Sequence, residues 1–475
     1  MTAFMVASIT QTLTAQTGRP FIHDPSTVVE DKGKYYSFGT GGGGIMSDDG
    51  WKWTSGAVRP GGGAAPDALK IGDRYLIVYG ATGGGRDYKG IIYSMWNKTL
   101  DPKSPDFKYT EPVIVATSDG YEDNDAIDPG LMLDPTTGKL WLSYGTYYGY
   151  IRLVELDPKT GKRVAGNKPV NIAITCEASA LMYRDGWYYL LGTHATCCAG
   201  PNSTYNILVG RSKSVTGPYM DNVGRPMLQG GGKMVASTDG PLIGPGHFGS
   251  TIIEKGVEKM SFHWEADLNM GGRSVLGVLP LVWKNGWPAV GQNIKAGTYA
   301  IQSERRGFAL GLAVDMPSMQ GGGGGFGGGG GNANAAIKPV PFLQVSDVIS
   351  TWPTGDINTR LIEYMSRPHQ KWSISPAPDS SGYLGAPYYK IVIAGTEKAL
   401  TATADGQVIT VPKYTGAPEQ LWKLDQLTDG TYRIMPRSVP NSKEPLALIS
   451  MGDATPVLGK FDFNSDNSKW NFKAQ

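Results

Sequence analysis

The 475-residue chain has little of what several function classes require. Only 18% of its residues are charged and its formal net charge is +2, with no long basic run to track phosphates or an anionic membrane surface. Its longest apolar run, VLGVLPLVW, contains Pro280 and is far shorter than the roughly 20 residues that span a bilayer. Neither nucleic acid nor a membrane is therefore expected as a partner.

Cysteine is also scarce. Three cysteines are too few for a disulfide scaffold, but Cys197 and Cys198 are adjacent. They form either a vicinal disulfide or two buried free thiols. Residues 1–19 contain no basic residue before Arg19, so this N-terminal segment is not typical of a secretory signal.

Turn-forming and aromatic residues are abundant instead, with 66 Gly, 32 Pro, 24 Tyr and 12 Trp. This composition favours short strands, and apolar residues alternate or run in fours rather than following a helical period. A turn followed by an aromatic strand and a Gly, Ser or Thr recurs five times. The copies are KGKYYSFGT (32–40), IGDRYLIVYGAT (71–82), TGKLWLSYGT (137–146), RDGWYYLLGT (184–193) and KGVEKMSFHWE (255–265). Their irregular spacing argues against a solenoid and predicts an all-β chain that begins with a five-bladed β-propeller over residues 20–294.

Three acids precede repeated strands of this pattern: Asp24 in FIHDPST, Asp128 in DAIDPGL and Glu177 in ITCEASALMY. Asp24 beside a proline also suits a simple turn. In a propeller, however, the first strand of each blade lines a central channel, so the three acids are expected to converge. Burial pushes the pKa values of neighbouring acids apart, which is what glycoside hydrolysis requires. Glu177 follows Cys176 in an apolar strand and suits a general acid, whereas Asp24 is expected to stay ionised as a base.

The segments HDPS, AIDPG, CEAS and GPGHFGS together resemble the motif set of glycoside hydrolase family 43, in particular its arabinan-degrading members, over roughly residues 20–290. The resemblance implies that Asp24 is the general base, Glu177 the general acid and Asp128 the residue that tunes the pKa of Glu177. It also implies inversion at the anomeric carbon, for which acid and base stand ~6.5–9.5 Å apart.

The resemblance further implies a calcium ion, or another hard cation, that His247 faces in the central channel among waters. A turn histidine is the alternative. Two positions depart from the family pattern. Asp125 stands where the family usually has Asn, and AAPD replaces WAPD, so that Asp67 either contacts substrate or braces the first blades.

Other candidate substrate contacts surround these motifs. Aromatic residues either stack on sugar faces or pack between blades. The loop HATCCAGPNSTYN (194–206) follows the strand of the general acid and would present the cysteine pair to the substrate. The candidates are His23, Phe21, Asp67, Cys197, Cys198, Tyr205 and Trp264.

The C-terminal part contains a second repeat. HQKW, EQLW and NSKW end in Trp372, Trp422 and Trp470, which are spaced by 50 and 48 residues. These endings resemble the QxW motif of ricin-B-type β-trefoils, the fold of family 13 carbohydrate-binding modules, and predict a trefoil over residues 295–475. Ser468 replaces Gln in the third copy, and both a structural brace and a lectin-like module remain open.

A glycine-rich run, residues 320–336, would ordinarily indicate a linker between domains. The first repeat nevertheless begins before it, at GTYAIQS (297–303). Tyr299 and Trp372 are 73 residues apart, against 33 for Tyr389 and Trp422. The run is therefore interpreted as a loop inserted into the first trefoil repeat.

The sequence thus predicts a monomeric, secreted or periplasmic, inverting hydrolase of α-1,5-linked L-arabinofuranosyl chains. An exo-acting arabinanase or arabinofuranosidase and a β-xylosidase are alternatives on the same scaffold. A non-catalytic glycan-binding protein is less well supported, because such a protein has no need of three desolvated carboxylates.

Overall fold

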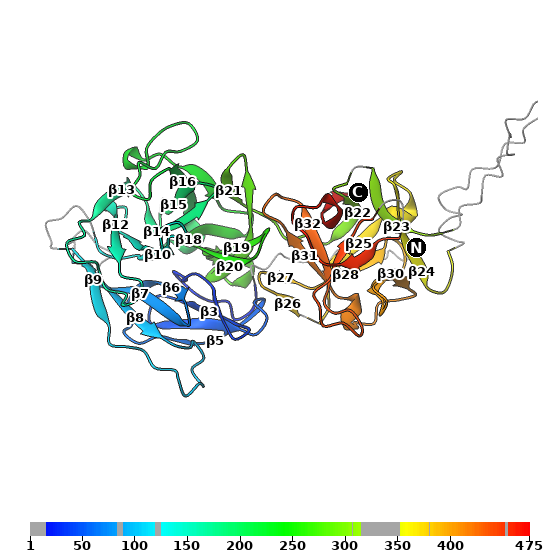
Figure 1. Cartoon of the computed structure of the whole chain (residues 1–475), viewed down its shortest axis with the longest axis horizontal. Coiled ribbons are helices and arrows are strands. Elements are labelled where there is room, and N and C mark those ends of the chain that lie inside the picture. Colours follow the sequence, from blue (N-terminus) through cyan, green and yellow to red (C-terminus); the bar gives the residue numbers. More distant parts are fainter. Residues whose placement is uncertain are drawn as a thin grey trace, which may run out of the picture. The chain divides into compact units, whose positions relative to one another are not determined.

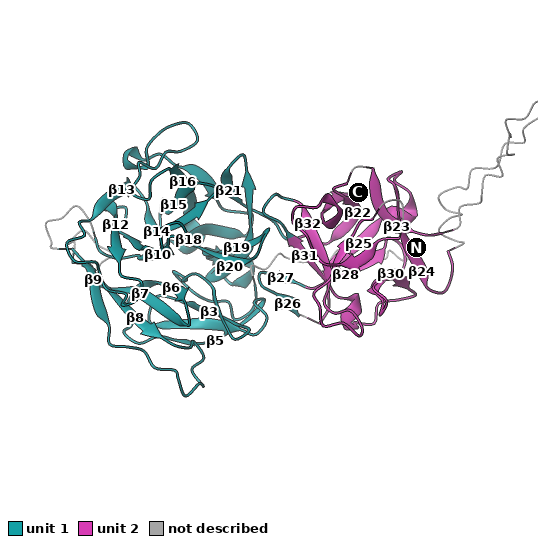
Figure 2. Cartoon of the chain, in the orientation of Figure 1, with its two compact units in different colours: residues 1–293, 380–387, 426–430 teal, residues 294–379, 388–425, 431–475 magenta. Residues whose placement is uncertain are grey.

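The computed structural model describes residues 16–82, 89–118, 125–305, 307–314, 352–379, 381–451 and 455–475 (Figure 1). They divide into two compact units (Figure 2). Unit 1 comprises residues 1–293, 380–387 and 426–430, and unit 2 comprises residues 294–379, 388–425 and 431–475. Within the described ranges, no helix has the length and apolar character needed to cross a membrane. The glycine-rich run 320–336 lies outside them.

Unit 1 contains five sheets of four or five strands, and the prediction of a five-bladed propeller is confirmed. Blade 1 consists of β1 (Thr17–Gly18), β5 (Lys52–Val58), β4 (Gly43–Ser47), β3 (Lys34–Phe38) and β2 (Val29–Asp31). Blade 2 consists of β6 (Ala64–Ile71), β7 (Arg74–Thr82), β8 (Ile91–Asn97) and β9 (Val113–Thr117). Blade 3 consists of β10 (Gly130–Leu133), β11 (Leu140–Tyr144), β12 (Tyr150–Leu156) and β13 (Val170–Ile174). Blade 4 consists of β14 (Glu177–Arg184), β15 (Trp187–His194), β16 (Asn206–Ser212) and β17 (Lys233–Ala236). Blade 5 consists of β18 (Leu242–Glu254), β19 (Val257–Asp267), β20 (Arg273–Lys284) and β21 (Trp287–Val290).

The remaining elements of unit 1 are short. A two-stranded sheet pairs β26 (Gly382–Tyr383) with β27 (Ala386–Pro387). Single 3₁₀ turns are η1 (Gly200–Asn202), η2 (Met227–Gln229) and η3 (Leu268–Met270).

The first and last blades are joined by the chain segment between β1 and β2. Phe21 forms an antiparallel bridge with Val275 in β20. The amide of Leu276 donates to the carbonyl of Pro20 at 2.8 Å. These contacts fix the segment that leads directly into His23 and Asp24.

One backbone feature recurs in all five blades. A residue other than glycine has a positive φ at or just before each innermost strand: Asp24 (49°), Ala65 (44°), Asp128 (52°), Ala178 (48°) and His247 (57°). L-residues rarely adopt this left-handed conformation, so it persists only where the surrounding structure enforces it. The short motifs HDPS, AAPD, IDPG, EASA and GHFG are therefore five copies of one turn, and the acids of the sequence motifs lie at or beside it.

Unit 2 is the predicted β-trefoil. Six strands pair in a closed ring, β22 (Gly297–Ser303), β25 (Trp372–Pro376), β28 (Tyr389–Ile393), β31 (Trp422–Gln426), β32 (Tyr432–Pro436) and β35 (Trp470–Ala474). The strands outside the ring are β23 (Phe308–Leu312), β24 (Ile357–Glu363), β29 (Ala399–Ala402), β30 (Val408–Val411), β33 (Ala447–Ile449) and β34 (Val457–Gly459). Each QxW-like ending forms a 3₁₀ turn, η4 (Pro368–Gln370), η5 (Pro418–Gln420) or η6 (Asp466–Ser468).

The three tryptophans of these endings are fully buried in the core of unit 2. Each indole N–H donates to a backbone carbonyl, Trp422 to Leu400 at 3.0 Å and Trp470 to Leu448 at 2.9 Å, both 22 residues upstream. Trp372 makes the same bond to Leu310 at 2.9 Å, but 62 residues upstream. The first repeat thus carries extra chain between two equivalent positions, as the insertion hypothesis requires.

The tryptophans therefore build the trefoil core. Replacing Trp422 with Ala should lower the free energy of unfolding by about 3–5 kcal/mol through lost packing. Trp422→Phe keeps most of the ring but leaves the carbonyl of Leu400 without its donor, and should cost about 1–3 kcal/mol. Denaturant unfolding of the full chain measures both; a Trp422→Phe protein as stable as the wild type would contradict this role of the indole N–H.

Candidate active site

The five turns meet around one cavity. Residues from every blade line a small cavity of about 20 Å³, among them Pro25, Asp67, Asp128, Ala178 and His247. This volume has room for an occupant the size of one water molecule. The convergence of the motif residues, which are up to 222 positions apart in the chain, follows from the propeller topology.

Asp24 is a buried carboxylate that accepts three hydrogen bonds from side chains. The hydroxyl of Thr40 donates to Oδ2 at 2.6 Å, His23 Nδ1 lies 3.0 Å from Oδ2, and His247 Nε2 lies 2.9 Å from Oδ1. Burial alone would raise the pKa of Asp24, but the charges and hydrogen bonds of His247 and His23 hold it well below its usual value. Asp24 is therefore ionised at neutral pH.

His23 lies between two carboxylates, since its Nε2 is 3.1 Å from Oε1 of Glu265. Both ring nitrogens face acceptors, so both carry a proton. Burial opposes the charge, but Asp24 and Glu265 raise the pKa of His23 to about 10. The side chain is 34% exposed, which leaves this cation accessible from the mouth of the site.

His263 and Glu265, on β19, complete the cluster and were not identified from the sequence. His263 Nδ1 accepts the backbone N–H of Asp24 at 2.9 Å, and its Nε2 lies 3.0 Å from Oε1 of Glu265. The available signal was the alternation in FHWE, which directs His263 and Glu265 to the same face of a strand. It does not reveal the contacts with His23 and Asp24, because those residues are more than 230 positions away.

Glu177 has the opposite protonation state to Asp24. It is 6% exposed and accepts a hydrogen bond from the hydroxyl of Tyr205 on Oε1. Burial, followed by the negative charges of Asp128 and Asp24, raises its pKa to about 9. Burial also raises the pKa of Asp128 to about 7, against the opposing charge of His247 and with the help of Asp24. Glu177 is therefore protonated at neutral pH, while Asp24 is not.

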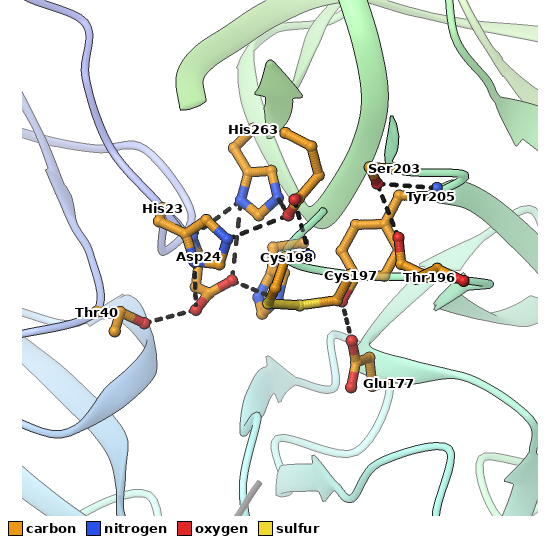
Figure 3. Close-up of a disulfide and its surroundings, with 12 residues drawn as sticks. His23, Asp24, Thr40, Glu177, Thr196, Cys197, Cys198, Ser203, Tyr205 and His263 are labelled. Carbon is orange, nitrogen blue, oxygen red and sulfur yellow. Dashed lines mark hydrogen bonds and ion pairs between the residues drawn. A yellow bond between two sulfur atoms is a disulfide. The ribbon is translucent and has the colours of Figure 1, made fainter. Parts of the chain in front are cut away.

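The adjacent cysteines form a vicinal disulfide beside this cluster, as Figure 3 shows. One nitrogen of His23 and the two sulfur atoms lie within 4.8 Å of one another. The N–H of Cys198 donates to Oε2 of Glu265 at 2.8 Å, which anchors the loop. Cys176 is a buried free thiol.

Three other candidates have structural partners. The carboxylate of Asp67 accepts the N–H of Thr27 at 3.1 Å and that of Leu131 at 2.8 Å, so Asp67 braces blades 1 and 3. Trp264 is 3% exposed within the core of blades 4 and 5, as in the packing alternative, and offers no free face to a sugar. The guanidinium carbon of Arg273 lies 3.5 Å from the ring centroid of Phe21 and covers one of its faces.

Tyr205 is 1% exposed. Its burial and its bond to Glu177 make it a partner of the carboxyl group rather than a platform on which a sugar stacks.

The site combines one protonated and one ionised carboxyl, the two forms that general acid and general base catalysis require.

Several known proteins are similar to this chain. The Bacillus subtilis (strain 168) protein named extracellular endo-α-(1→5)-L-arabinanase 1 is 34% identical over 229 residues, covering 47% of this chain and 68% of the relative. The crystal structure of an exo-1,5-α-L-arabinanase from a bovine ruminal metagenomic library has a TM-score of 0.53 and 32% identity, covering 57% of this chain and 97% of that chain. The Cellvibrio cellulosa α-L-arabinanase complexed with arabinohexaose has a TM-score of 0.53 and 28% identity, covering 57% and 95%.

Two family models match the chain. The model described as ricin-type beta-trefoil lectin domain-like covers residues 368–446. The model described as glycosyl hydrolases family 43 covers residues 17–288. Because this second match runs through all five blades and takes up more than half of the chain, the protein belongs to glycosyl hydrolases family 43.

Proposed function

We propose that the protein hydrolyses α-1,5-L-arabinofuranosidic bonds of arabinan and cuts at internal positions of the polysaccharide. The observation that carries this proposal is the pair of opposite protonation states in one site, a neutral Glu177 and an ionised Asp24. The relatives named arabinanases, one of them holding arabinohexaose, support a polymer of L-arabinofuranose as the substrate class.

In the proposed mechanism Glu177 donates its proton to the leaving glycosidic oxygen while Asp24 takes a proton from the attacking water. The C–O bond of the leaving group breaks as the water oxygen bonds to the anomeric carbon from the other side, which inverts its configuration. Asp128 raises the pKa of Glu177 by its negative charge. Exchange with solvent then returns both carboxyls to their starting states.

Exo action is the second candidate, because the ruminal relative is named an exo-arabinanase. Export to an oxidising compartment is expected, since the Bacillus relative is named extracellular and the Cys197–Cys198 disulfide suits such a compartment.

A hard cation in the channel also fits the residues present. The cavity of about 20 Å³ beside His247 admits one occupant, and Asp67 and Asp128 line the same space. His247 Nε2 bonds Asp24, so in the neutral ring that a metal ligand requires, Nδ1 would be the nitrogen left to face an ion. A calcium ion held there by His247, with its waters lying outside this cavity, would supply a fixed positive charge near the reacting carboxyls in place of the imidazolium.

Linear arabinan incubated with the wild-type protein should yield a ladder of short oligosaccharides early in the reaction. Glu177→Gln should lower kcat about 100- to 10,000-fold, because the leaving oxygen loses its proton donor. Chromatography of products over time measures both, with Glu155→Gln, which pairs with Lys139 in blade 3, as a control. A single short product from the start would indicate exo rather than endo action. Unchanged turnover in Glu177→Gln would rule out Glu177 as the general acid.

The raised pKa of Glu177 predicts the alkaline limit of activity. A general acid works only while protonated, so kcat/KM should fall as pH rises through about 9. Asp128→Asn removes a negative charge that raises this pKa and should move the alkaline limb to lower pH. Asp134→Asn, another buried acid of blade 3, is the matched control and should leave the limb in place. Identical limbs in the wild type and Asp128→Asn would contradict this coupling.

The cation hypothesis predicts bound metal. Elemental analysis of the purified protein should find about one equivalent of calcium or a similar hard cation, and His247→Ala should reduce it. A wild-type protein that is active and yet contains no metal after dialysis against a chelator would contradict the hypothesis.

A further inference from the structure

We propose that Glu265 is a positioning residue that fixes the orientation of Asp24 through His263 and holds the disulfide loop in register with it. This inference rests on the proposed function, in which Asp24 is the general base. Glu265 lies on β19 of blade 5, at the end of the repeat copy KGVEKMSFHWE, and none of the segments HDPS, AIDPG, CEAS and GPGHFGS includes it.

The carboxylate of Glu265 connects three segments of the chain. Oε1 accepts from Nε2 of His263 at 3.0 Å and from Nε2 of His23 at 3.1 Å. Oε2 accepts the N–H of Cys198 at 2.8 Å. The residue is 4% exposed, so a carboxylate buried to this extent depends on these donors. Burial would raise its pKa, but the hydrogen bonds from His23 and His263 lower it to about 2, and Glu265 remains charged.

This charge selects the tautomer of His263. Nδ1 of His263 accepts the N–H of Asp24 and must therefore carry a lone pair. The ring proton is consequently on Nε2, which points at Oε1 of Glu265. Burial lowers the pKa of His263, which keeps the ring neutral. Without the carboxylate, the tautomer that accepts from Asp24 loses its stabilising partner.

The hydrogen bond from Asp24 to His263 is made by the backbone of a strained turn. Asp24 has a φ of 49°, and a non-glycine residue keeps this conformation only where its surroundings impose it. His263 supplies the acceptor for the backbone of Asp24 at this turn. Losing that acceptor should therefore change the direction of the Asp24 carboxylate.

His263 also stacks on the two histidines that bond the side chain of Asp24. The ring centroid of His263 lies 4.7 Å from that of His23 and 5.4 Å from that of His247, with the planes within 30° of parallel. His23 contacts Oδ2 of Asp24 and His247 contacts Oδ1. His263 thus packs against both histidines that hold the two oxygens of the base.

The test compares Glu265→Gln with wild type on linear arabinan and on a 4-nitrophenyl glycoside of an α-1,5-arabino-oligosaccharide. Glutamine keeps the size of the side chain but sets an amide N–H₂ against one of the donors. We expect kcat to fall about 10- to 100-fold on both substrates, because the base step is needed whatever group leaves. Glu177→Gln should instead be largely relieved by the 4-nitrophenyl leaving group.

Rescue of the rate by sodium azide distinguishes a positioning role of Glu265 from a merely structural one. Azide needs no deprotonation: its nitrogen bonds to the anomeric carbon while the leaving oxygen takes the bond pair and the proton of Glu177. Azide should therefore raise the rate of Glu265→Gln several-fold on the 4-nitrophenyl substrate and form a glycosyl azide of inverted configuration. Wild type should show no comparable gain.

The matched control is Glu258→Gln, on the same strand. Glu258 is also 4% exposed and bonds Ser250 at 2.8 Å and Arg184 at 2.9 Å, away from the site. It should lose stability but keep kcat and show no azide effect. His263→Leu, which removes the acceptor for Asp24, should reproduce the azide effect. It is the deciding variant if Glu265→Gln does not fold.

Wild-type kcat in Glu265→Gln or, where that variant does not fold, in His263→Leu would overturn the inference. So would a loss of kcat that azide does not rescue and that follows the unfolding midpoint as in Glu258→Gln. A wild-type protein that cuts neither substrate would remove the proposed function itself, and with it this inference.

Discussion

The arrangement of the site depends on keeping the carboxylate of Asp24 charged while it is buried. An isolated buried carboxylate would take up a proton, because desolvation disfavours its charged form. Here Thr40, His23 and His247 donate to its two oxygens. The negative charge that results is in turn one reason why the pKa of Glu177 is raised. The opposite protonation states of the two carboxyls are thus one coupled electrostatic property.

The propeller makes this coupling possible by repeating one turn. Left-handed residues at Asp24, Ala65, Asp128, Ala178 and His247 lie within, or a few residues before, the five inner strands. Two positions hold acids that face the channel, one holds a histidine and two hold alanine, so the same backbone serves different chemical roles. At the alanine positions, the functional carboxyl belongs to a neighbouring residue, Glu177 before Ala178 and Asp67 two residues after Ala65.

In the trefoil, by contrast, the repeated residues stabilise the core. Its three tryptophans make the same buried bond to a backbone carbonyl, and the extra chain in the first repeat leaves that geometry unchanged. Ser468 replaces the glutamine of the other two repeats and still accepts a backbone N–H, from Asp462 at 3.2 Å. A repeat can therefore vary in its loops while its core contacts are kept.

The sequence by itself determined the architecture, because turn-and-strand repeats and QxW-like endings are local patterns that imply burial. It also identified Asp24, Asp128 and Glu177 as a group, since equivalent positions in a propeller converge. Only the tertiary structure decided which residues surround them. His23 and Glu265 meet across 242 positions, Asp24 and His263 across 239, and Tyr205 turned out to be the partner of Glu177. Trp264 proved to be buried in the core. Protonation, tautomers and exposure depend on distances between segments remote in the chain, and no local pattern encodes those distances.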